Sequence, residues 1–348
     1  MRRTARDLRR GNRFDILRRL YRTADVSRHE IAHDTGLSFA TVSNAIGDLL
    51  ELGVLVEAGF VSSGGGRPRA LIAVNADRGA LIGVDVAETY VHAEAFDLRL
   101  RSLGVVEREP HPRDNRPDDV VAHVVEAVES LLTIHRLTPT DVLGVGVSLP
   151  GQVDREAGVS VFAPNWNWHD VPIGAALTAR LGLPLHLDNP LKASTVAELW
   201  FGAGREADDL VVVTLGTGVG AGFAFGGSLH RGISNSAGEW GHTTLILDGR
   251  LCHCGSHGCV EAYVGAAGIM QNLRELAPDS ALLHSGGQTA TIVELAHAAD
   301  RQDPVAHKVL TDTARYLGAG IANLVNIVNP ELVVLGGWVG SRLGSHLI

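Results

Sequence analysis

Residues 238–259, GEWGHTTLILDGRLCHCGSHGC, hold all three cysteines of the chain. The thiolates of Cys252, Cys254 and Cys259, together with one imidazole, would form the closed tetrahedral ligand set that suits structural Zn²⁺. Three buried, inert cysteines are the alternative, but such close spacing favours a metal site. Four protein ligands leave no open coordination position, so this run predicts a structural zinc ion rather than a catalytic one.

The fourth ligand is expected to be a histidine. His242 is the best candidate because Gly241 beside it frees the backbone. His253 and His257 lie inside the cysteine loop and compete with it. Glycines within the loop allow the sharp turns that would bring three sulfurs to one ion.

Composition describes a globular protein large enough for two or three domains. The 348 residues are 45% hydrophobic and 20% charged. No apolar run approaches the roughly 18 residues that a membrane span needs, and the arginine-rich start is not followed by the apolar core of a secretory signal. With the cysteines assigned to zinc, none remains for disulfides. We therefore expect a cytoplasmic protein with no membrane partner.

Charge is distributed unevenly along the chain. Residues 1–75 carry a net charge of +4, whereas the remainder carries −13, within a total of −9. A basic head on an acidic body indicates that only the head meets a polyanion.

Three helical patterns fill the first 53 residues. The first covers Arg6 to Tyr21, and the second opens with a Ser27–Glu30 capping box and ends near Gly36. The third covers Phe39 to Leu52. Two short helices joined by a glycine-containing connection predict a helix-turn-helix, with a small protein-interaction domain as the alternative.

The second helix of such a pair enters the major groove with its first residues. The candidate DNA-binding residues there are Ser38, Phe39, Ala40, Thr41, Ser43 and Asn44. After Gly53 the apolar residues alternate along the chain as in a hairpin wing. The glycine-rich tip of this wing would present Arg67 and Arg69 to phosphates or the minor groove. A solvated glycine–arginine linker is the competing interpretation of this tip.

From Ala80 onward the pattern changes to buried strands and helices. Strands are expected over 80–85, 90–98, 142–149 and 211–215, and a helix over 117–136. Gly216 to Gly222 then forms a glycine-rich turn through which backbone amides could approach a phosphate. Glycines also occur in tight hairpins, so the turn alone is weak evidence for phosphate binding.

These pieces together resemble the ROK family, which groups sugar kinases with sugar-responsive repressors of the xylose and N-acetylglucosamine type. The resemblance rests on the following motifs: Gly65 to Pro68 in the wing, Ala163-Pro164-Asn165-Trp166, Asn189, Ala197-Glu198, the turn from Leu215, Gly238 to His242, the cysteine run ending at Glu261, and Asn329 to Gly337.

The resemblance implies a winged helix-turn-helix domain, mainly α, over 1–75. It is followed over 76–348 by an α/β two-lobed, actin-like (ribonuclease-H-like) body with a structural zinc site. The lobes are expected over about 76–190 and 191–348. Family members usually continue with a further C-terminal helix, so we expect either that the chain is a fragment or that this helix is missing.

Two departures from the family's kinases bear on activity. Kinases follow the first strand with Asp-x-Gly-Gly-Thr, whereas Asp85 is followed here by Val-Ala-Glu-Thr, 86–89. Glu88 would repel phosphate there. Kinases also carry Asn-Asp-Ala-Asn, in which the Asp is the general base. That position is Pro190, which cannot take a proton, and the second Asn is Lys192. We predict that the chain is not an enzyme.

The resemblance also implies a sugar site formed by Asn165, Asn189, Glu239, His242 and Glu261. His242 would bind zinc through one ring nitrogen and sugar through the other. Trp166 or Trp168 would supply an apolar wall. Alternatively, these polar groups only satisfy one another. Lys192 hints at an anionic ligand, but we expect it to be solvent-exposed.

The sequence thus predicts a sugar-responsive repressor of carbohydrate uptake or catabolism genes. Its partners would be double-stranded operator DNA, a sugar or sugar phosphate, and copies of itself in a homodimer or homotetramer. A sugar closing the cleft would shift the population between two states of the dimer. The alternatives are a DNA-tethered, ATP-using sugar kinase, with Asp188 or Asp85 as base, and a constitutive repressor.

Overall fold

The structure is a computed structural model that describes residues 5–23, 25–61, 68–88, 90–110, 115–284 and 286–348. The chain forms two compact units. The first comprises 1–150, 155–160 and 170–188, and the second comprises 151–154, 161–169 and 189–348. No helix within the described ranges is long and apolar enough to cross a membrane.

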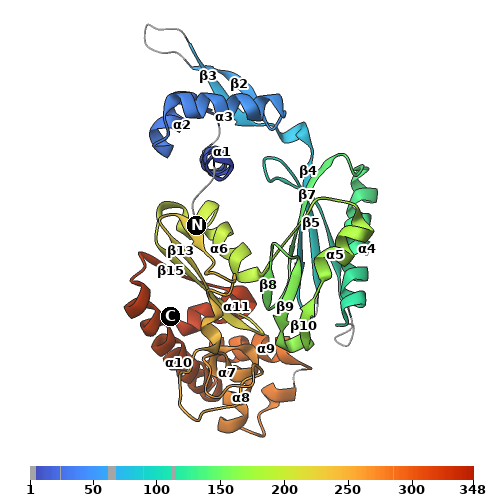
Figure 1. Cartoon of the computed structure of the whole chain (residues 1–348). Helices are drawn as coiled ribbons and strands as arrows, with labels where there is room; N and C mark the ends of the chain where they lie inside the picture. The colour runs from blue at the N-terminus through green and yellow to red at the C-terminus, as the bar shows by residue number, and fades with distance from the viewer. Residues whose placement is uncertain (1–4, 24, 62–67, 89, 111–114, 285) are drawn as a thin grey trace. The chain divides into compact units, whose positions relative to one another are not determined.

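The first unit begins with a three-helix head and a two-stranded wing (Figure 1). The three predicted helices are confirmed, but a short strand, β1, pairs with β3 ahead of the second helix and was not predicted. The elements of the head are α1 (Ala5–Arg22), β1 (Val26–Ser27), α2 (Arg28–Thr35), α3 (Phe39–Glu51), β2 (Leu55–Val61) and β3 (Arg69–Val74).

Local chemistry fixes where the head's helices begin. Ser27 and Glu30 form the predicted capping box, in which each side chain satisfies the other's backbone amide. The hydroxyl of Ser38 accepts a hydrogen bond from the backbone amide of Thr41 at 3.1 Å and so caps α3. Gly36, in the left-handed region with φ of 68°, ends α2 as expected.

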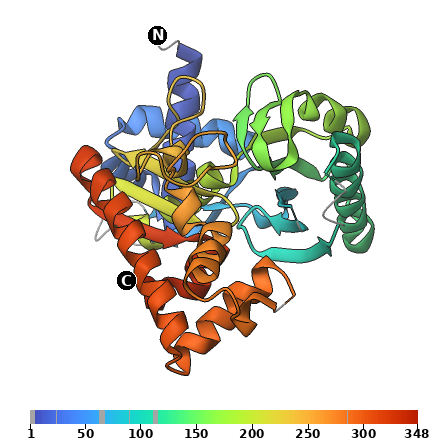
Figure 2. The ribbon, with the colours of Figure 1, turned by 90° about the horizontal axis from the view of Figure 1, so that it is seen from below.

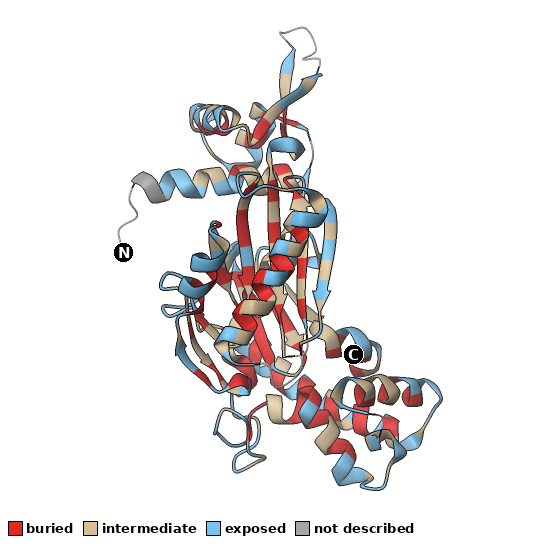
Figure 3. Ribbon diagram, turned by 90° about the vertical axis from the view of Figure 1, so that its right-hand side faces the viewer, coloured by how far each residue is buried: buried red, intermediate tan, exposed pale blue. Residues whose placement is uncertain are grey.

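The remainder of the first unit is built on a five-stranded sheet of order β11-β7-β4-β5-β6. Its buried residues alternate along β4 and β5, and α4 packs against β5 and β6 beside α5 (Figure 3). The elements are η1 (Ala76–Arg78), β4 (Ala80–Val86), β5 (Val91–Asp97), β6 (Ser102–Arg108), α4 (Pro117–His135), β7 (Val142–Ser148), α5 (Ile173–Leu181) and β11 (Leu185–Asp188).

Head and sheet share one hydrophobic core. Leu98, from the turn between β5 and β6, is 3% exposed and belongs to the cluster that includes Ile16, Ile46 and Ile72 of the head. A hydrogen bond from a side chain reinforces this junction, because Arg99 Nε donates to the Val74 carbonyl at 2.9 Å. The head is therefore packed onto the sheet rather than joined to it by a linker alone.

A small sheet of order β10-β9-β8 has residues in both units. Its strands are β8 (Gln152–Asp154), β9 (Val159–Ala163) and β10 (Trp168–Val171), with η2 (Pro164–Trp166) between the last two. In the second unit, Trp166 and Trp168 pack ring to ring, with centroids 4.7 Å apart.

The second unit contains a four-stranded sheet of order β14-β13-β12-β15 and a set of helices that includes the long α10 (Figure 2). The strands are β12 (Leu210–Leu215), β13 (Val219–Phe225), β14 (Ser228–His230) and β15 (Leu332–Gly336). The helical elements are α6 (Pro190–Trp200), η3 (Ala203–Glu206), η4 (Glu239–His242), α7 (Glu261–Val264), α8 (Ala266–Leu276), η5 (Ala281–His284), α9 (Gln288–Asp300), α10 (Pro304–Val328) and α11 (Gly337–Leu347).

The glycine-rich segment 216–222 is less of a turn than its composition suggests. Val219 already pairs with Leu215, so the second half of the segment is strand β13. A methyl group on Gly222 would overlap the Thr195 side chain, and one on Gly220 would overlap Leu191. These two glycines therefore let α6 lie close against β13.

Candidate functional site

The predicted zinc ligands converge in the second unit. One ligand atom from each of His242, Cys252, Cys254 and Cys259 lies within 4.8 Å of the other three. The Sγ atoms of Cys254 and Cys259 are 3.7 Å apart, which is too far for a disulfide. Of the competing histidines, His257 places Nδ1 3.0 Å from the carbonyl oxygen of Gly249 instead. The four side chains predicted from sequence are the four that come together.

The electrostatics of this cluster suit a divalent cation. Burial raises the pKa of the Cys252 and Cys259 thiols, and the neighbouring Glu261 carboxylate adds to the effect. A bound cation would favour the thiolate forms that these surroundings otherwise oppose. Three sulfurs and an imidazole can thus hold a metal ion, and the set leaves no ligand position open for a reactant.

Glu261 links the metal cluster to strand β13. Its Oε2 accepts a hydrogen bond from the Val219 amide at 2.8 Å, while Oε1 lies 3.6 Å from the Cys252 sulfur. His242 places Nδ1 3.7 Å from the same sulfur. With Nδ1 in the cluster, Nε2 is the nitrogen left for another partner, as the expected dual role of His242 requires.

Glu239 begins η4, three residues before His242. Among the described residues, no hydrogen-bond partner of its carboxylate is found, and the residue is half-buried. Burial raises the pKa of Glu239, and the charges of His242 and Lys192 oppose that rise. A half-buried carboxylate with accepting capacity to spare is suited to binding ligand hydroxyl groups.

Lys192 corrects the sequence-based expectation of a solvent-exposed lysine. It lies in the first turn of α6 and is 0% exposed. Its Nζ donates a hydrogen bond to the carbonyl oxygen of Ala237. The expectation was wrong because a long charged side chain is normally solvated, and here the backbone of a distant loop takes the place of water.

The other proposed sugar contacts also lie in the second unit. Asn189 is 2% exposed and caps α6, accepting from the Lys192 amide at 3.1 Å, so its side-chain oxygen already has a structural task. Asn165 faces His253, whose Nδ1 lies 3.3 Å from the asparagine Oδ1. His253, which the sequence offered as an alternative zinc ligand, thus lies beside Asn165.

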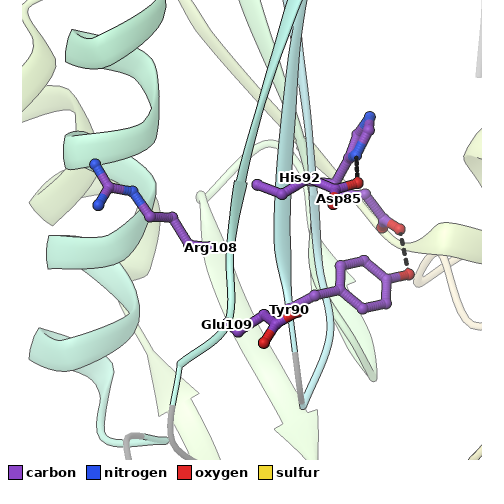
Figure 4. Close-up of a pocket in the computed structure, with 6 residues that line it drawn as sticks. Asp85, Tyr90, His92, Arg108 and Glu109 are labelled. Atoms are coloured by element: carbon purple, nitrogen blue, oxygen red, sulfur yellow. Dashed lines mark hydrogen bonds and ion pairs between the residues drawn. The ribbon is translucent and has the colours of Figure 1, made fainter.

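Asp85, the carboxylate at the end of β4, is held by two hydroxyls. Ser148 Oγ donates to Oδ1, and Tyr90 donates to Oδ2 at 2.8 Å, as Figure 4 shows for the tyrosine. Asp85 and Tyr90 line a pocket of about 580 Å³ together with His92, Glu107, Arg108 and Glu109. Thr89, in the altered motif, lies outside the described residues.

In the head, the candidate DNA-binding residues occupy the start of α3. Phe39 is 47% exposed and packs against His29, with ring centroids 4.5 Å apart, while Ala40 and Asn44 are also exposed. The hydroxyls of Ser38 and Thr41 bond each other at 2.8 Å, and Ser43 is half-buried. Arg69 begins β3 and is exposed, whereas Arg67 lies outside the described residues.

A winged helix-turn-helix head on an actin-like, kinase-fold body with a Cys₃His cluster defines the class of protein. A model described as winged helix-turn-helix DNA-binding matches residues 9–56. A model of the ROK family matches residues 81–343, and the chain therefore belongs to the ROK family.

Both branches of the family are represented among its relatives. The chain is 31% identical over 332 residues to the xylose repressor of Caldicellulosiruptor bescii, covering 93% of this chain and 82% of the relative. It is 33% identical over 280 residues to a glucokinase of Halalkalibacterium halodurans, covering 77% and 82%. The crystal structure of a ROK family transcriptional regulator, a homologue of the E. coli MLC protein, superimposes with a TM-score of 0.81 at 24% identity, covering 98% and 86%.

Proposed function

We propose that this protein is a sugar-responsive transcriptional repressor of carbohydrate uptake or catabolism genes. The observation that carries the proposal is the shared core at Leu98, which joins a helix-turn-helix head to a ROK-family body. The match to proteins named xylose repressor, which includes the head, supports the same class. Operator DNA would be bound through α3 and the wing, and the molecule would act as a homodimer or homotetramer.

The effector would be a sugar bound by hydroxyl contacts to Glu239, His242, Glu261, Asn165 and Asn189. Sugar binding can change DNA affinity only through different affinities for two states of the protein. Because the head packs onto the first unit's sheet, a shift of that sheet would carry the head with it. Half-site spacing in the oligomer would then change, and the operator would be released.

We further propose that the body has no kinase activity. Pro190, at the first position of α6, stands where the family's kinases carry the general base. The two alternative carboxylates both have partners, since Asp85 binds Ser148 and Tyr90, and Asp188 lies 3.4 Å from Arg155 Nε. A general base must be free to reach the hydroxyl proton of its substrate.

Zn²⁺ is the ion proposed for the Cys₃His cluster. It would hold the 242–261 loop closed and thereby keep Glu261 and His242 in place. It would supply structure only, with no part in a reaction.

The test is binding of the purified protein to DNA from its own upstream region. D-xylose, D-glucose, N-acetylglucosamine and their phosphate esters would be added in turn, with fluorescence anisotropy of the DNA as the readout. Release or tightening by one of them supports the regulator. A coupled assay that detects sugar-dependent ATP consumption would instead favour the kinase, and DNA binding that no sugar alters would favour a constitutive repressor.

A further inference from the structure

Lys192 is one of only two lysines in the chain, and it is the one that is buried. The other, Lys308, lies on α10, where its side chain is 53% exposed and pairs with Asp312. Enclosing an ammonium group is costly unless hydrogen bonds replace its water. A buried lysine must therefore bind protein groups that replace water around its ammonium group.

The Lys192 ammonium lies against the segment that carries Glu239. Its Nζ donates to the carbonyl oxygen of Ala237, and the next carbonyl, that of Gly238, accepts a hydrogen bond from the Ala221 amide at 2.9 Å. Two successive carbonyls are thus fixed, one by α6 and one by β13. The peptide that leads into Glu239 has little freedom left.

Gly238 shows how closely the segment is held. Its φ of 105° lies in the left-handed region, and an added Cβ would overlap the Ala221 carbonyl and come within 3.4 Å of Lys192 Nζ. The residue thus lies against both β13 and the ammonium group. Any side chain at this position would push the segment away from both.

The lysine reaches the segment because α6 is pinned at its own start. The Asn189 side chain caps the helix on the Lys192 amide, and Gly220 and Gly222 let α6 approach β13 closely. On the far side of Glu239, η4 leads directly to His242 of the metal cluster. Glu239 is therefore held between two anchors, Lys192 before it and the metal cluster after it.

We propose that Lys192 is a positioning residue of the effector site, which sets Glu239 to receive a sugar hydroxyl by holding the Ala237 carbonyl. The proposal rests on the sugar-responsive function proposed above. It also assigns the lysine's charge an internal partner, so Lys192 is not a phosphate-binding group. Because the charge next to the ligand is then that of Glu239, the sugar bound there is unphosphorylated.

The first test needs no sugar. Lys192→Met keeps the length and the apolar stem of the side chain but removes the charge, and Lys308→Met is the matched control. Hydrogen exchange followed by mass spectrometry should show peptides covering 231–242 exchanging at least tenfold faster in Lys192→Met and unchanged in Lys308→Met. Unchanged exchange in Lys192→Met overturns the proposal. If Lys192→Met does not fold, Lys192→Leu, which likewise cannot donate to the carbonyl, is measured in its place.

The second test measures affinity for the sugar that acts in the anisotropy assay. Lys192→Met and Glu239→Gln should each weaken binding at least tenfold, whereas the double variant should be no more than about twofold weaker than Glu239→Gln alone. Such non-additivity is expected if Lys192 acts through Glu239. Additive losses, or tight binding of the 6-phosphate that depends on Lys192, overturn the proposal. If the wild type binds no sugar, the proposed function fails, and the exchange experiment still decides whether Lys192 holds the segment.

Discussion

The hydroxyl of Tyr21, in the first helix of the head, donates a hydrogen bond of 2.7 Å to the carbonyl oxygen of Leu98 in the turn after β5. The Leu98 side chain fills the core of the same head. At the other end of the β4–β5 hairpin, Val86 pairs with Val91, next to Asp85 and Tyr90. One pair of strands thus runs from the buried core of the head to the pocket around Asp85.

Replacing Leu98 by alanine should destabilise the head. The substitution leaves a cavity in a closed core and should lower the free energy of unfolding by about 3 kcal/mol. Leu103→Ala, at a position 41% exposed on β6, is the matched control and should cost well under 1 kcal/mol. Urea denaturation of both variants measures the difference. Equal losses would show that Leu98 is not part of the head's core.

Asp97 should make the same junction sensitive to acid. Burial alone would raise its pKa, but hydrogen bonds from Arg101 and Arg99 outweigh burial and hold the pKa below its ordinary 3.8. Its contribution to stability is therefore complete above about pH 4 and is lost as pH falls through the lowered value. Asp97→Asn should cost about 2 kcal/mol at neutral pH. The gap to wild type should close below pH 4, and a gap that is constant down to pH 2.5 would contradict this assignment.

Asn44 should contribute to sequence recognition. It is exposed on α3, and an asparagine in the major groove can pair with an adenine edge. We expect Asn44→Ala to weaken operator binding about tenfold and to reduce discrimination against other sequences. Asn326→Ala, at an exposed position on α10, should leave affinity unchanged. Anisotropy with operator and scrambled DNA measures both effects.

Arg69 should contribute affinity without sequence selectivity. Loss of one phosphate contact weakens the salt dependence of DNA binding. The slope of log affinity against log salt concentration then becomes shallower by about 0.9. Arg69→Ala should show that change equally on operator and scrambled DNA. An unaltered slope would mean that the start of β3 does not touch the backbone.

Loss of one cluster thiol should remove the metal and the sugar response together. Cys254→Ser should reduce bound zinc from about one equivalent to near zero, lower solubility and abolish the effect of sugar on DNA binding. His257→Ala is the matched control, because His257 lies in the loop but outside the cluster. Elemental analysis measures the metal content. A Cys254→Ser variant that responds normally to sugar would separate the metal from the effector site.

Local sequence signals predicted much of this architecture. The capping box at Ser27, the stop at Gly36 and the Cys₃His cluster all depend on residues close in sequence, and each was located correctly. Strand β1 was missed because its two residues are defined only by pairing with β3.

Two features could not be predicted because they depend on contacts between distant segments. Leu98 ends a predicted strand, and nothing nearby in sequence shows that its side chain enters the core of the head. Lysine is usually a surface residue, and the burial of Lys192 depends on contacts such as its hydrogen bond to the carbonyl of Ala237, 45 positions away. Segments far apart in sequence build both the junction and the effector site.

In the proposed repressor, one molecule couples sugar binding to operator binding, and coupling of this kind is reciprocal. The most direct measurement is calorimetric titration of the active sugar into the protein alone and into its complex with operator DNA. If sugar weakens DNA binding by some factor, the complex should bind sugar more weakly than the free protein by the same factor. Equal sugar affinities with and without DNA would show that the two sites are not coupled.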